Sequence, residues 1–167
     1  ALEEITDTNP SYKDMRNWKT NDGHMSIFAG FTYDGTTNEI NPYVGTGGHE
    51  PYMFQIPTIA GQDYNWSFIY SGSAYDSWHS TEFHAYVAND YNLNTTETGA
   101  SYNNNVIGIA EAFPFAGVEN KPYSIDFTAK QNNETLVVQF GDANDGKELW
   151  FKLANIKVSK YIYPLAY

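Results

Sequence analysis

The chain has 167 residues, about the length of one ordinary domain, and it contains no cysteine. Nine Lys and Arg residues against 20 Asp and Glu residues give a net charge of −11, which disfavours nucleic acid, anionic membranes and acidic polysaccharides as partners. Aromatic residues make up 17% of the chain, more than a small core needs, so some are expected at the surface. No segment has the pattern of a membrane span or a signal peptide. We therefore expect a mature or excised domain, exported to the extracellular space or the cell surface of a bacterium.

Alternation of large apolar and polar residues dominates the sequence and predicts an all-β fold. Helical periodicity is nearly absent, with one short candidate at 11–18. About eight strands at this spacing predict a β-sandwich jelly roll of two antiparallel sheets, with residues 1–167 forming a single domain. In chain order, the expected strands cover residues 26–33, 52–59, 64–70, 82–87, 106–113, 123–130, 135–140 and 149–158.

The same alternation predicts which side chains lie in the core, because successive side chains of a strand point to opposite faces. The residues placed on core faces are Tyr64, Trp66, Phe68, Tyr70, Phe83, Ala85, Val87, Ile125, Phe127 and Ala129. Between the strands, Pro57 indicates an edge strand or a bulge, and Asn132-Asn133 indicates a turn. Residues 36–50 and 89–105 are expected to be long loops.

Catalytic and metal-binding patterns are weak in this sequence. A jelly-roll glycosidase needs two carboxylates across a cleft, and the best strand-borne candidates, Glu82 and Glu111, have no recognisable catalytic context. The four His residues do not have the spacing of a zinc motif, and no nucleophile motif is present. The sequence therefore predicts no catalytic residue and no metal ligand.

Aromatic residues in polar surroundings are the strongest functional signal. Sugars present C–H faces that stack on Trp and Tyr rings, and their hydroxyls need polar partners. The polar loop 70–80 carries Tyr75 and Trp78, so we predict Trp78 as a principal ligand contact and Tyr75 as a secondary wall. The alternative is that Trp78 is half-buried packing. Trp150 shares a strand face with Lys152, away from the core face, and is predicted as a second secondary wall.

The strand 82–87 supplies the remaining predicted contacts. Glu82, His84 and Tyr86 share its non-core face, about 7 Å apart along the strand, close to the width of a sugar ring. Tyr86 is predicted to stack on the ligand, while Glu82 and His84 would form hydrogen bonds with it. A buried, satisfied pair is the alternative for His84 and Tyr86. Trp18 would close one end of the cleft, or else cover the core as a lid.

Several segments carry a resemblance to a known group of proteins. The run Gly61-Gln62-Asp63-Tyr64-Asn65-Trp66-Ser67-Phe68 resembles the "Gly-x-x-Tyr-x-Φ-Ser-Phe" strand of carbohydrate-binding modules of the family 4, 9 and 22 group. The segments 123–129, 136–141 and 149–158 are similar to the closing strands of that group, so the resemblance covers roughly residues 51–160. It implies a galactose-binding-like jelly roll with a ligand cleft across a concave sheet.

The resemblance implies a non-catalytic module that recognises a neutral β-1,4-linked plant polysaccharide, xylan first and β-glucan second. Such a module would be covalently linked to a catalytic domain, a xylanase or related glycoside hydrolase. The alternatives are a surface adhesion or interaction module of the same fold, or a small jelly-roll glycosidase. A structural calcium is common in the group, but Ala154 and Asn155 stand at the expected acidic position, so no cofactor is predicted.

Overall fold

A computed structural model describes residues 1–19, 39–40, 52–74, 82–88, 106–114, 118–140 and 149–164. Within these residues the fold is all-β, and its one helical element is a short 3-10 turn, η1 (Met15–Asn17). None of the described helical residues forms a helix long and apolar enough to cross a membrane. The strands are β1 (Leu2–Glu4), β2 (Glu39–Ile40), β3 (Tyr52–Gln55), β4 (Asp63–Ala74), β5 (Glu82–Ala88), β6 (Val106–Pro114), β7 (Val118–Thr128), β8 (Thr135–Phe140) and β9 (Leu149–Tyr161).

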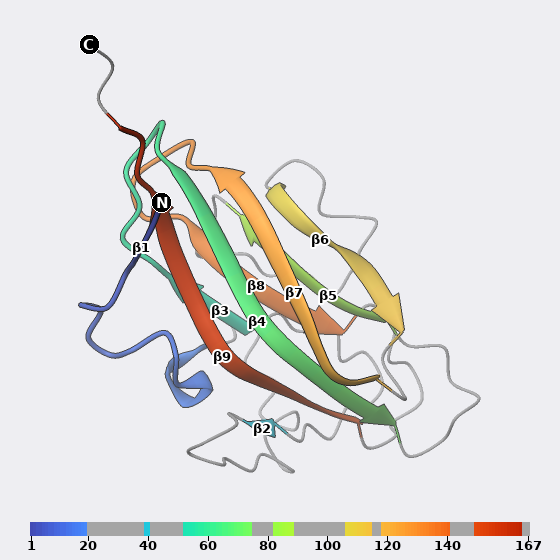
Figure 1. The fold of residues 1–167 in the computed structure, drawn as a ribbon. Helices are drawn as coiled ribbons and strands as arrows, with labels where there is room; N and C mark the ends of the chain where they lie inside the picture. Colours follow the sequence, from blue (N-terminus) through green and yellow to red (C-terminus); the bar gives the residue numbers. More distant parts are fainter. Residues whose placement is uncertain are drawn as a thin grey trace.

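Two antiparallel sheets form the sandwich that the alternation predicts (Figure 1). One sheet has the order β1-β9-β4-β7, with β2 also paired to β9, and the other has the order β3-β8-β5-β6. The fold class is therefore confirmed. The strand expected at 26–33 lies outside the described residues. The structure adds β1 and β2, which are too short to show an alternating pattern.

The core between the sheets is unusually aromatic. The inward side of β4 supplies four of its aromatic residues, all at most 2% exposed: Tyr64, Trp66, Phe68 and Tyr70. The ring of Tyr64 stacks on that of Phe127 in β7, with ring centroids 5.5 Å apart. Nine of the ten residues predicted for core faces are buried in one large cluster between the sheets, the main core. The tenth is Phe83, whose side chain lies outside the described part of the structure.

A bulge in β9 keeps that strand in phase with the core. Between Ser67 and Ile69 of β4 the pairing shifts, and Asn155 of β9 has a positive φ of 53°. Asn tolerates this left-handed conformation better than most residues. Because the bulge adds a residue, Leu153 before it and Ile156 after it both lie buried in the core. The predicted turn at Asn132-Asn133 is also confirmed, since these residues connect β7 to β8.

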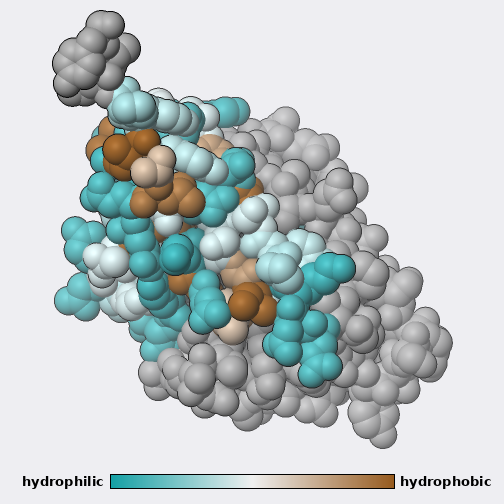
Figure 2. All heavy atoms as spheres, viewed as in Figure 1, coloured by the Kyte–Doolittle hydropathy of each residue, from teal (hydrophilic) through white to brown (hydrophobic). Residues whose placement is uncertain are grey.

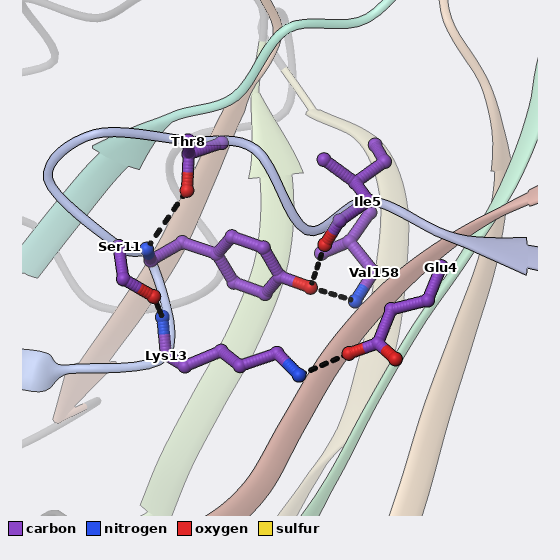
Figure 3. Close-up of polar contacts among 7 residues, drawn as sticks. Glu4, Ile5, Thr8, Ser11, Lys13 and Val158 are labelled. Carbon is purple, nitrogen blue, oxygen red and sulfur yellow. Dashed lines mark hydrogen bonds and ion pairs between the residues drawn. The ribbon is translucent and has the colours of Figure 1, made fainter.

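Hydrogen bonds of the Tyr12 side chain hold the N-terminal segment against β9, and its partners Ile5 and Val158 are labelled in Figure 3. The Tyr12 hydroxyl donates a hydrogen bond to the Ile5 carbonyl at 2.8 Å and accepts one from the Val158 N–H at 3.0 Å. Lys13 forms an ion pair with Glu4 in the same region. This segment brings Tyr12, Met15 and Trp18 into the main core cluster.

Candidate functional site

The outer face of the β3-β8-β5-β6 sheet is the face on which the sequence places a ligand. Ala85 and Val87 of β5 lie in the main core, whereas Tyr86 packs in a separate cluster with Met53 and Val137. The two faces of β5 are therefore divided as the alternation predicts.

This second face is covered at the positions described. Tyr86 has no exposed surface and His84 is 5% exposed. Both therefore lie as packing residues do, which is the alternative left open by the sequence. Their role as ligand contacts stays a prediction, and it requires a bound sugar to reach a face that is closed at these two positions. The strand pattern shows on which face a side chain lies but not whether another segment covers that face.

Trp18 belongs to the core. Its side chain is 5% exposed, its ring centroid is 6.1 Å from those of both Phe54 and Trp66, and its indole N–H donates a hydrogen bond to the Tyr12 carbonyl at 2.8 Å. The arrangement is that of a lid on the core, the second of the two roles predicted for this residue. A residue that forms a wall of a cleft needs an exposed ring face. The Trp18 ring packs against two aromatic residues and is almost fully buried.

The other predicted contacts are only partly placed. Tyr75 and Trp78 lie outside the described residues. For Glu82 and Trp150 the structure describes the backbone: Glu82 lies in β5, and Trp150 lies in β9, where it pairs with Ser73 of β4. Because β5 and β9 belong to different sheets, Glu82 and Trp150 do not lie on a single sheet face. In the described part of the chain, no three His, Cys, Asp or Glu side chains gather in a way that could hold a metal ion.

A different surface, on the β9-β4-β7 side, combines aromatic rings with hydrogen-bonding groups. An open groove of about 480 Å³ lies there, within the volume range of small-molecule sites. Figure 2 shows this side of the molecule, with hydrophilic side chains over the strands and hydrophobic ones gathered near the N-terminus. The groove is lined by Asp63, Tyr64, Asp126, Phe127, Thr128, Lys130, Tyr161 and Tyr163.

Two carboxylates organise this groove through hydrogen bonds across the sheet. Asp63 accepts hydrogen bonds from the Thr128 hydroxyl at 2.5 Å and from the Tyr163 hydroxyl at 2.6 Å. Asp126 accepts hydrogen bonds from the Asn65 amide at 2.8 Å and from the Tyr161 hydroxyl at 2.7 Å. We call these six residues the Asp63–Asp126 network.

The network favours ionised carboxylates and neutral phenols. The Thr128 hydroxyl, helped by that of Tyr163, lowers the pKa of Asp63. The Asn65 amide and then the Tyr161 hydroxyl lower the pKa of Asp126 in the same way. Donating these hydrogen bonds to a carboxylate in turn raises the pKa of Tyr161 and of Tyr163. All four donors are therefore neutral groups, and the two carboxylates keep their negative charge.

The two tyrosine rings are near-parallel, with an interplanar angle of 11° and ring centroids 6.3 Å apart. Tyr163 is 62% exposed, so the ring is available to solvent. No pattern in the sequence singles out this network. The outward phase of Asp63 and Asp126 is visible in the alternation of β4 and β7, but their meeting with Tyr161 and Tyr163 depends on pairing between strands far apart in the chain.

Comparison with solved structures confirms the fold. The chain is similar to a family 4 carbohydrate-binding module, with a TM-score of 0.52, 13% sequence identity, and coverage of 77% of this chain and 87% of that one. It is also similar to the N-terminal cellulose-binding domain of β-1,4-glucanase C from Cellulomonas fimi, with a TM-score of 0.51, 13% identity, and coverage of 86% and 94%. No protein-family model matches the sequence. No curated protein matches it either.

These similarities define the class of fold. The chain has the β-sandwich of the carbohydrate-binding modules, and the resemblance carried by the strand motifs is confirmed at this level. At 13% identity the comparison concerns the fold, and function has to be argued from surfaces.

Proposed function

We propose that this domain is a non-catalytic carbohydrate-binding module that recognises single chains of a neutral β-1,4-linked polysaccharide, xylan first and β-glucan second. It would be attached to an extracellular glycoside hydrolase and raise the local concentration of substrate around that enzyme. The observation that carries the proposal is the shared fold, which extends over 86% of the chain in the match to a cellulose-binding domain of a β-1,4-glucanase.

Composition supports the same ligand class. A chain with a net charge of −11 and only 17% charged residues is suited to an uncharged partner, and its aromatic content of 17% suits sugar C–H faces. The proposed contacts lie on the non-core side of β5, which we call the β5 face, and in the loop 70–80. Trp78 and Tyr86 are the proposed principal aromatic residues, and Glu82 and His84 the proposed hydrogen-bonding groups.

The test is affinity electrophoresis of the whole domain in gels that contain xylan, xyloglucan, mixed-linkage glucan or mannan, alongside pull-down on crystalline cellulose. We expect retardation by xylan or a β-glucan and little binding to crystalline cellulose. Migration unaffected by every soluble polysaccharide would contradict the proposal and favour an adhesion module. Release of reducing sugar from a retarding polysaccharide would instead indicate a glycosidase.

Paired measurements of affinity and melting temperature test the residues. Replacing a stacking ring with Ala is expected to weaken binding about tenfold or more. For Trp78→Ala we expect this loss with a nearly unchanged melting temperature. For Tyr86→Ala, whose side chain is fully buried, we expect a lower melting temperature as well. Unchanged affinity in both variants would show that the ligand does not use the β5 face.

A further inference from the structure

We propose that the Asp63–Asp126 network is a second saccharide-binding surface, separate from the β5 face, where a sugar ring stacks on Tyr163 and donates hydroxyl hydrogen bonds to Asp63 and Asp126. The proposal takes its ligand class from the proposed function and adds a site to it. Its basis is the combination, within one open groove of about 480 Å³, of exposed aromatic surface and ionised acceptors.

The acceptors have capacity that the described residues do not fill. Each carboxylate offers about four lone-pair positions, so the pair offers about eight. The described residues donate four hydrogen bonds to them, from Asn65, Thr128, Tyr161 and Tyr163. Sugar hydroxyls are donors that can use the remaining positions, and hydrogen bonds to an ionised acceptor are stronger than those between neutral groups.

The rings are held in place before any ligand arrives. An exposed side chain normally loses conformational freedom when it binds, which reduces affinity. Here the hydroxyls of Tyr161 and Tyr163 are fixed by hydrogen bonds to Asp126 and Asp63, at 2.7 Å and 2.6 Å. Because both rings are oriented by these bonds and lie near-parallel, part of that entropic cost is already met by the fold.

The groove offers ring surface beside its charged groups. Lys130 lines the groove with the two carboxylates and offsets part of their negative charge. Flat phenol rings add the kind of surface that sugar C–H faces bury.

The surface is distinct from the one on β5. Asn65 and Asp126 lie on strands of the β1-β9-β4-β7 sheet, in phase opposite to the buried residues Trp66 and Ile125. The β5 face belongs to the other sheet, and the outer faces of two sheets packed on a common core point in opposite directions. A module with both surfaces could contact two polysaccharide chains at once.

The test uses the whole domain with xylohexaose and cellohexaose as probes. Calorimetric titration gives the number of sites, and NMR of tyrosine-labelled protein reports on the rings of Tyr161 and Tyr163, assigned through the Tyr→Phe variants. We expect both ring signals to shift on titration. Tyr163→Ala and Asp126→Asn should each weaken binding at this surface about tenfold, and both variants should stay folded at the temperature of the titration because both positions are exposed.

Ile162→Ala is the matched control, because Ile162 is a partly exposed neighbour in the same segment, and its binding should equal that of the wild type. If the wild type binds a probe while the ring signals stay fixed and both variants bind normally, the second surface is wrong and the proposed function stands. If Tyr163→Ala abolishes all binding, the network is the saccharide site and the β5 face is not. If no probe binds and no ring signal shifts, the second surface is refuted, and the polysaccharide gels decide the proposed function separately.

Discussion

Replacing Trp18 with Ala separates the two roles predicted for this residue. Its ring is 5% exposed and contacts Phe54 and Trp66, and its N–H satisfies the Tyr12 carbonyl. Truncation of such a buried aromatic side chain costs about 3–5 kcal/mol, because the apolar contacts are lost and a cavity remains. A domain of this size has a free energy of unfolding of about 5–15 kcal/mol, so the loss is a large share of the total.

The expected result is a melting temperature lowered by roughly 6–20 °C, since 1 kcal/mol corresponds to about 2–4 °C in domains of 150–250 residues. Thermal and urea denaturation followed by circular dichroism measure the loss, and affinity electrophoresis at low temperature measures binding by the folded protein. Trp18→Phe, which keeps an aromatic ring but removes the N–H donor, should lose less stability. A Trp18→Ala domain with wild-type stability and a tenfold lower affinity would refute the assignment of this residue to the core.

Three further predictions concern the Tyr12 hydroxyl, the two carboxylates of the network and the charge of the ligand. Tyr12→Phe should lower the free energy of unfolding by about 1–3 kcal/mol, measured in urea, because the Val158 N–H loses its acceptor and the Ile5 carbonyl loses its donor; a change below about 0.5 kcal/mol would contradict this. The carboxylates of Asp63 and Asp126 have lowered pKa values in the folded state, so their stabilising contribution is present above the normal pKa of 3.8 and is lost as the pH falls through the folded-state pKa. Asp126→Asn should therefore make stability less dependent on pH in that acid range, and melting curves with the same acid dependence as the wild type would count against the network. Affinity for a neutral polysaccharide should change little between low and moderate ionic strength, because no counterions are released, whereas a steep loss with added salt would indicate a charged ligand.

The local pattern of the chain predicts the longer described strands and their core faces. The strand predicted at 135–140 has the same bounds as β8, and Trp66, Ile125 and Phe127 are buried as their alternation requires. This information is local because neighbouring residues of a strand necessarily point to opposite faces. Even the bulge at Asn155 preserves the result, since residues on both sides of it return to the core.

Which residues meet across strands, and which faces are covered, is decided only by the tertiary structure. Alternation assigns Tyr86 to the non-core face of β5 correctly, yet that side chain is fully buried, because coverage of a face depends on other parts of the chain. Likewise, Tyr163 reaches Asp63 across 100 positions of sequence, through the side-by-side pairing of β9 with β4. Strand order and register are set by the packing of whole sheets, so no local pattern in the sequence contains them.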